Sequence, residues 1–331
     1  MSSNVAGRGK TVARLIISLV LIALALWIFF HRQWIIDQVM LLRYTPSAEV
    51  SALADRSSMT DEGKRYFFAS RPEVHSATTF NERCRTRSEQ SVVLGCYTLQ
   101  RIYLFDVTDE RLEGVKEVTA AHEMLHAAYD RLGPSERERV NALIQAEIDK
   151  VSDQRILELI KLYEKTEPGE KLNEMHSILA TESQQLAPEL EEYYRQYFDD
   201  RSAVVALTQQ YESVFASIKE TQSTLLADLQ ALNATVKQRS DALNASIVTL
   251  NNDIATFNQR ARSGQFSSQA EFNAGRSSLM QRQEAMQQEH DSINRLIEQY
   301  NRKRDELIAL NSEAESLNQS LDSTPNEVPS F

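Results

Sequence analysis

The sequence predicts a mainly α-helical protein with a small β-hairpin, an N-terminal transmembrane helix and a C-terminal antiparallel coiled-coil hairpin. Three observations lead to this prediction. An apolar run occupies residues 15–30. A His-Glu-x-x-His motif at residues 122–126 lies among small and apolar residues, as is typical of a buried helix. Apolar residues then recur with heptad spacing through residues 203–321, which is the pattern of long helices packed together.

The N-terminal apolar run has the composition of a signal anchor. It is shorter than the ~20 residues that cross a bilayer comfortably, but snorkelling of the flanking Arg14 and Arg32 can extend it. A cleaved signal peptide is the competing interpretation, and we favour an uncleaved anchor because no small-x-small cleavage site follows closely. More basic residues precede the run than directly follow it. This bias predicts a single-pass protein of the cell membrane, with a cytoplasmic N-terminus and everything beyond Trp34 outside.

Charge and cysteine content restrict the partners that the chain can have. The net charge of −11 argues against binding to nucleic acid and to an anionic membrane surface. The chain has two cysteines, Cys84 and Cys96, and both lie on the predicted exported side. Because that compartment is oxidising, one disulfide is favoured over two free thiols.

Short helices and a hairpin are expected between the anchor and the motif. Residues 35–44 can continue the helix out of the bilayer, and capping-type residues open short helices over residues 47–54 and 60–70. Residues 91–98 and 101–107 are rich in β-branched and aromatic side chains. Only two residues separate these segments, so the sequence predicts a β-hairpin.

Helices follow from the motif to residue 198. The motif helix is expected to begin near Arg111 and to end at Gly133, where glycine can adopt a left-handed cap and Pro134 starts the next helix. One long helix is then predicted over residues 135–163. Further helices are expected over residues 171–185 and from Pro188 through residue 198.

The motif itself predicts a metal site formed by His122, Glu123 and His126. Histidines four positions apart lie on one face of a helix, where two imidazole nitrogens can reach the same metal ion. Glu123 follows the first histidine directly, where its carboxylate can act as general base toward a water that the metal activates. Such a motif also arises by chance, but two of only six histidines in this chain occupy it.

A catalytic zinc ion needs a third protein ligand and an open position. Asn173-Glu174, inside an expected helix, resembles the Asn-Glu pair that supplies this ligand in gluzincin metallopeptidases such as thermolysin and the zinc aminopeptidases. The motif region is also similar to membrane-anchored bacterial predicted metallopeptidases. The resemblance covers residues 91–182 and implies a zincin-like domain that binds zinc through His122, His126 and Glu174.

The chain departs from the gluzincin pattern at one position. Ile178 stands four residues after Glu174, where those enzymes have an acidic residue that supports a histidine. Glu182, which lies near the same helical face, and His176 therefore stay open as alternative third ligands.

The resemblance implies hydrolysis of peptide bonds in a peptide or protein substrate, with Glu123 as general base. By analogy, residues 94–98 or 101–107 would bind the substrate backbone as an added strand. A further group must stabilise the oxyanion that forms during hydrolysis. The candidates come from the helices after the motif, and packing in the core is the favoured role for each of them: His176, Tyr193, Tyr194 and Tyr197.

The C-terminal third is expected to form an arm. Its two heptad seams, over residues 211–257 and 272–321, are separated by one break near Gly264, which predicts an antiparallel hairpin that can bind an envelope protein. The alternative function is therefore a non-catalytic cell-envelope scaffold or adhesin that uses this coiled coil. The predicted parts are an anchor at residues 1–34, a metallopeptidase domain at 35–202, a coiled-coil hairpin at 203–321 and a disordered tail at 322–331.

Overall fold

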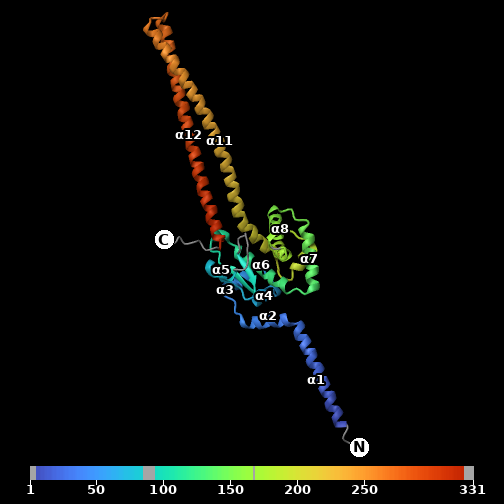
Figure 1. Cartoon of the computed structure of the whole chain (residues 1–331). Helices are drawn as coiled ribbons and strands as arrows, with labels where there is room; N and C mark the ends of the chain where they lie inside the picture. The colour runs from blue at the N-terminus through green and yellow to red at the C-terminus, as the bar shows by residue number, and fades with distance from the viewer. Residues whose placement is uncertain (1–4, 85–93, 167, 324–331) are drawn as a thin grey trace. The chain divides into compact units, whose positions relative to one another are not determined.

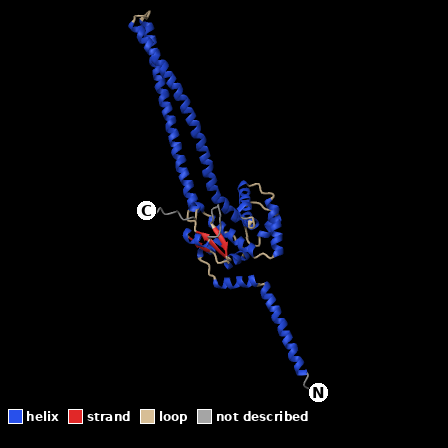
Figure 2. Cartoon of the chain, in the orientation of Figure 1, coloured by secondary structure: helices blue, strands red, loops and turns tan. Residues whose placement is uncertain are grey.

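The computed structural model describes residues 5–84, 94–166 and 168–323, with side chains from residue 16 onward. The protein is mostly helical and has one small three-stranded sheet, which confirms the predicted mainly α class (Figures 1 and 2). The chain divides into two compact units. The first comprises Met1–Val214 and Leu317–Phe331, and the second comprises Phe215–Ser316.

Two helices open the chain, α1 (Val5–Phe30) and α2 (Arg32–Arg43). Among the described residues, no single helix is long and apolar enough to cross a membrane. The apolar part of α1, Ile16–Phe30, meets that criterion only together with α2, from which it is bent by 70°. The helix beyond the apolar run is therefore present as expected, but it changes direction at His31 instead of continuing straight.

Two short capped helices follow. They are α3 (Ala48–Arg56) and α4 (Asp61–Ala69). Ser47 caps α3 by accepting a hydrogen bond from the backbone N–H of Val50, and Thr60 caps α4 in the same way through Gly63. Both helices begin within two residues of their predicted starts. The caps fix these starts because they satisfy backbone donors that are otherwise free in the first helical turn.

The predicted hairpin is present and belongs to a larger sheet. Strand β2 (Gly95–Thr98) pairs antiparallel with β3 (Arg101–Phe105), and the turn residues Leu99 and Gln100 have φ values of 50° and 57°. Residues 91–93 of the predicted first strand lie outside the described residues. The pattern analysis missed β1 (Glu73–His75), which pairs parallel with β3, because three residues are too few to show a period. The strand order is β1-β3-β2, so β2 lies at an edge.

A disulfide ties β2 to the preceding helix. Cys84, directly after α5 (Ala77–Arg83), is bonded to Cys96 in β2 across a sequence separation of 12 residues. This confirms the favoured disulfide. In the chain-entropy model a loop of this length contributes about 3 kcal/mol to stability.

The motif helix α6 (Val115–Asp130) begins later than predicted. A short 3₁₀ helix, η1 (Glu110–Leu112), precedes it, and Gly114 separates the two with a φ of 98°. Gly114 therefore provides a left-handed backbone that the pattern analysis did not anticipate. The predicted left-handed cap at Gly133 is wrong, because Gly133 has a φ of −65° and precedes the next helix.

The predicted single helix over residues 135–163 is also wrong. It consists of α7 (Pro134–Ile148) and α8 (Gln154–Thr166). Asp153 ends the break by accepting hydrogen bonds from the backbone N–H groups of Arg155 and Ile156. An aspartate that caps a new helix competes with continuation of the old one.

The core of the first unit forms where α6 meets α9 (Lys171–Glu182) and the sheet. α6 is buried along nearly its whole length and packs against α3, α4, α9, β2 and β3. α10 (Pro188–Tyr194) closes the far side against α7. Buried residues such as Met124, Leu125, Met175 and Leu179 form this core.

The second unit consists of parts of two long helices, α11 (Arg201–Arg262) and α12 (Gln269–Leu321). Ion pairs join them in antiparallel order, because a higher number on one helix pairs with a lower number on the other. The pairs are Asp228 with Lys303, Arg239 with Glu289, and Asp253 with Arg282.

The start of the predicted disordered tail is ordered. Ser323 is 6% exposed, and its carbonyl oxygen accepts a hydrogen bond from the side-chain amide of Asn81. Residues 324–331 of that predicted tail lie outside the described residues.

Candidate metal centre

The two histidines of the motif face each other on α6. The Nε2 atoms of His122 and His126 are 3.1 Å apart, and one potential ligand atom from each of His122, Glu123 and His126 lies within 4.8 Å of the others. This group could hold a metal ion. The His126 side chain is 1% exposed and that of His122 is 21% exposed, so the group opens toward solvent on the His122 side.

Helix α9 places Glu174 beside the two histidines. Its Oε2 atom lies 3.7 Å from Nε2 of His122 and 3.6 Å from Nε2 of His126, and its side chain is 1% exposed. Three potential ligands of types that suit zinc, two imidazoles and one carboxylate, therefore converge from two packed helices.

The two alternative third ligands are engaged elsewhere. Glu182 forms an ion pair with Arg155 at 2.5 Å and lines a different surface pocket, beside Glu212. His176 is fully buried and its Nε2 atom lies 2.9 Å from the hydroxyl oxygen of Tyr193. Of the three residues considered, Glu174 is the one that the structure places beside the histidine pair.

The electrostatics of this cluster favour a bound cation. Burial lowers the pKa of His126, but its interactions with Glu174, Glu123 and Asn173 together outweigh burial and raise that pKa to about 9. Burial alone would raise the pKa of Glu174, whereas His126 and His122 hold it well below its ordinary value. A buried carboxylate is stable only when a positive charge compensates it, and either a proton on histidine or a metal ion can supply that charge.

Glu123 lies beside the histidines and has one carboxylate oxygen that could accept a further hydrogen bond. It is 3% exposed, and among the described residues its buried Oε2 atom has no hydrogen-bond partner. A buried carboxylate oxygen without a partner is costly, so its presence suggests a group that completes the site. The donor set and this orphaned oxygen together fit a metal ion with an associated water.

His126 receives support from a pair of residues that the pattern analysis did not assign. Its Nδ1 atom lies 3.0 Å from Oδ1 of Asn173, and the Asn173 amide donates to Glu170 at 3.1 Å. Hydrogen bonds of this kind orient the imidazole and fix which ring nitrogen is free to bind a metal. Ile178, at the position of the missing acidic residue, is instead a buried core residue. In the sequence, the position of Asn173 next to Glu174 was a signal for its role beside His126, but no sequence feature indicated a role for Glu170.

A cavity of about 490 Å³ lies beside His126. Its wall includes Cys96, Tyr97 and Thr98, so β2 lines it, whereas Ile102 and Leu104 of β3 are buried in the core. Of the two strands expected to line a substrate cleft, β2 is the one that contributes residues to this cavity. The other lining residues are Cys84, His126, Tyr129, Asp130, Arg137, Glu170 and Asn173.

The four candidates for stabilising an oxyanion are buried in the core, away from this cavity. His176, Tyr193 and Tyr197 form a buried hydrogen-bonded row, and the Tyr194 hydroxyl donates to the backbone carbonyl of His176. None of these four is among the residues that line the cavity. Tyr97, which sequence patterns did not single out, is the tyrosine that β2 contributes there, and its hydroxyl donates to Asp130 at 3.0 Å.

Gly95 permits the close approach of β2 to α6. A Cβ atom at this position would lie 2.7 Å from both Cγ and Oε1 of Glu123, and 2.6 Å from Cγ2 of Thr119. Any other residue would therefore push the strand away from the helix or displace Glu123.

We expect Gly95→Ala to lower stability by about 1–3 kcal/mol through overpacking. It should also reduce the peptide hydrolysis that the motif predicts, while metal content stays near that of the wild type, because both histidines are untouched. Gly133→Ala is the matched control, since a Cβ there meets nothing within 4 Å. Metal analysis, thermal unfolding and peptide hydrolysis would be measured for both variants. Equal behaviour of the two would contradict this role of Gly95.

Comparison with known proteins finds no matching family model, no matching curated protein and no matching solved structure.

Proposed function

We propose that this chain is a membrane-anchored, extracytoplasmic zinc metallopeptidase. The observation that carries the proposal is the convergence of His122, His126 and Glu174 within 3.7 Å, with the buried carboxylate of Glu123 next to them on α6. His122, His126 and Glu174 would hold the zinc ion, which suits a tetrahedral set of nitrogen and oxygen ligands with one position left open.

Each residue of the site has a distinct role in peptide hydrolysis. A zinc ion bound there would lower the pKa of a water molecule and polarise the scissile carbonyl group. Glu123 would accept the proton of that water and deliver it to the leaving amine. Asn173 would keep His126 in the orientation that presents Nε2.

The position of β2 supports binding of an extended peptide. β2 is an edge strand, its residues line the cavity, and Gly95 brings it against Glu123. An edge strand presents unpaired backbone groups, to which a substrate segment can add as a further strand. The substrate backbone would then add along the free edge of β2, beside the cavity.

The membrane anchor belongs to the same proposal. The described side chains of α1 from Ile16 to Phe30 are all exposed and nearly all apolar, so they need a non-aqueous environment. We place the N-terminus in the cytoplasm and the remainder of the chain outside. The Cys84–Cys96 disulfide is consistent with an oxidising exterior.

The metal content of the full-length purified chain tests the site directly. We expect about one zinc ion per chain, and loss of zinc in His122→Ala, His126→Ala and Glu174→Ala. Glu182→Ala is the matched control and should retain zinc, because Glu182 is paired with Arg155. Zinc that survives loss of both histidines would overturn the proposal, and loss of zinc in Glu182→Ala but not Glu174→Ala would overturn the ligand assignment.

We further propose that α11 and α12 form an antiparallel coiled-coil arm that binds an envelope protein. Support comes from the antiparallel ion pairs and from buried heptad residues, which include Leu225, Leu229, Leu243, Leu250 and Ile293. The rings of Phe257 and Phe272 lie 5.1 Å apart beside the turn.

Cysteines at these two positions should therefore form a crosslink within one chain. The double variant Phe257→Cys and Phe272→Cys should give an intramolecular disulfide after mild oxidation, detected by mass spectrometry. The control pair Leu229→Cys and Phe272→Cys should not, because residue 228 is paired with residue 303. Crosslinks only between chains would contradict the hairpin and favour a parallel dimer.

A further inference from the structure

Helix α2 turns two polar side chains toward the protein and leaves several apolar side chains exposed. Its polar side chains Gln33 and Asp37 turn toward the protein, whereas Ile36, Val39 and Leu42 are exposed. A surface helix of a soluble domain normally does the opposite.

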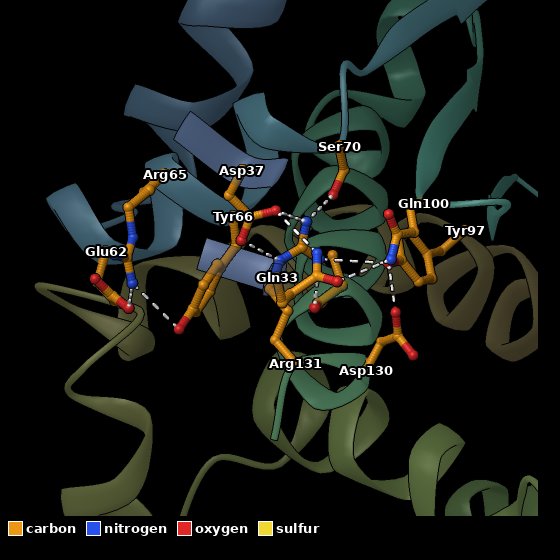
Figure 3. Close-up of polar contacts among 11 residues, drawn as sticks. Gln33, Asp37, Glu62, Arg65, Tyr66, Ser70, Tyr97, Gln100, Asp130 and Arg131 are labelled. Atoms are coloured by element: carbon orange, nitrogen blue, oxygen red, sulfur yellow. Dashed lines mark hydrogen bonds and ion pairs between the residues drawn. The ribbon is translucent and has the colours of Figure 1, made fainter. Parts of the chain in front are cut away.

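Hydrogen bonds hold the inner face of α2 firmly. Asp37 is 5% exposed and forms two hydrogen bonds with Arg131, from Nε at 2.9 Å and from Nη2 at 2.8 Å (Figure 3). Nη1 of Arg131 donates to the Ala127 carbonyl oxygen and the Tyr97 hydroxyl at 2.8 and 3.3 Å, and Nη2 also donates to the Ser70 hydroxyl at 3.4 Å. The Gln33 side-chain amide donates a hydrogen bond to Asp37 and accepts one from Gln100. The rotation of α2 about its axis is therefore set by these buried contacts.

This rotation determines which side chains face away from the protein. Relative to Asp37, the helical period places Ile36, Val39 and Leu42 on the opposite half of the helix, with Arg32 and Arg43 at its two ends. Leu42 is 88% exposed, although the burial of so large an apolar side chain is normally favourable.

The turn between β2 and β3 adds a further exposed apolar side chain near this helix. Leu99 is 91% exposed, and its neighbour Gln100 donates a hydrogen bond from Nε2 to Oε1 of Gln33 at 3.1 Å. Leu99 therefore stands at the tip of a hairpin that is attached to α2. We call Ile36, Val39 and Leu42 the apolar face, and Leu99 is a separate exposed apolar side chain beside α2.

We propose that the apolar face rests in the interface of the phospholipid bilayer that holds α1. The inference depends on the anchor in the proposed function and not on its peptidase activity. α1 and α2 are joined at His31 and bent by 70°, so α2 runs roughly in the membrane plane when α1 crosses near the normal, with the usual tilt of about 20°. The protein side of α2 is occupied, so the apolar face is the side that meets lipid.

Burial of apolar side chains, and not charge, carries this contact. The net charge of −11 opposes attraction to anionic lipid. An amphipathic helix in the interface buries its apolar side about 5–10 Å into the boundary between headgroups and acyl chains. Trp34, 49% exposed at the start of α2, is a residue type that is enriched at that depth.

The two native tryptophans, Trp27 and Trp34, make the proposal testable in the full chain. The chain is reconstituted in phosphatidylcholine nanodiscs that carry a nitroxide quencher either near the headgroup or near the end of the acyl chain. Trp34 is read alone in Trp27→Phe. Leu42→Trp and Leu99→Trp are read in a background where Trp27 and Trp34 are both phenylalanine. Tyr163→Trp on α8, which packs on α9, is the control in that background.

We expect Trp34, Leu42→Trp and Leu99→Trp to be quenched more by the shallow nitroxide than by the deep one, and the control to be quenched by neither. Position 42 lies about 12 Å along the helix from Trp34 at 1.5 Å per residue, so a helix that left the membrane would leave Leu42→Trp unquenched. That outcome overturns the proposal. Blue-shifted emission without quenching also overturns it, because it would show that protein covers the apolar face.

Trp27, read alone in Trp34→Phe, separates this inference from the anchor. Quenching of Trp27 without quenching of Leu42→Trp overturns only the interfacial contact, whereas absence of both also overturns the anchor. Zinc content, measured on the same preparation, reports on the metal site independently of either result.

Discussion

Glu123→Gln should keep the metal ion and lose hydrolysis by about 10²–10⁴-fold, the usual contribution of a general base. The amide has nearly the same shape as the carboxylate, so the packing of Gly95 against this side chain is preserved. It cannot accept the proton of the attacking water, whereas the three proposed ligands, His122, His126 and Glu174, are unchanged and should still bind the metal. The measurements are zinc content and the kcat for an unstructured peptide.

Glu138→Gln is the control for this prediction, because Glu138 is an exposed residue on α7 outside the metal centre. It should leave both zinc content and hydrolysis unchanged. A Glu123→Gln protein that retains zinc and hydrolyses peptides at the wild-type rate would show that another group acts as the base. Loss of zinc in Glu123→Gln would instead show that Glu123 is a ligand.

Among the single variants considered, Asp37→Ala should lower the free energy of unfolding the most, by about 3–5 kcal/mol. It leaves the buried guanidinium of Arg131 without its carboxylate partner. The side chains of Arg131 and Asp37 are only 4% and 7% exposed. The loss should appear as a lower urea midpoint when unfolding of α2 is followed by Trp34 emission in Trp27→Phe.

The pair of Glu192 and Arg195 provides a matched comparison for this ion pair. Their side chains are 71% and 72% exposed, so Glu192→Ala should cost only about 0–1 kcal/mol. A double variant, Asp37→Leu with Arg131→Met, should recover part of the lost stability, because two apolar side chains leave no buried charge. Similar costs for Asp37→Ala and Glu192→Ala would contradict a structural role for the buried pair.

The sequence alone identified features that depend on spacing along one helix or on residue type. The motif could be placed on a helix because histidines four positions apart necessarily share a face of that helix. The hairpin was predicted from two β-rich segments, and the disulfide between Cys84 and Cys96 from cysteine number and predicted compartment. These inferences need only local geometry or composition, so they did not require knowledge of packing.

Other features could be decided only by tertiary packing. Glu174 and Glu182 lie near the same face of α9, yet only Glu174 lies level with the histidines of α6, while Glu182 meets Arg155. Three further features likewise depend on how separate elements meet. They are the support of His126 by Asn173, the approach of Gly95 to Glu123 and the inward position of Asp37 on α2. Periodicity indicates which side of a helix is buried, but the neighbour that buries it, and at which level along the axis, follows from the packing of the whole core.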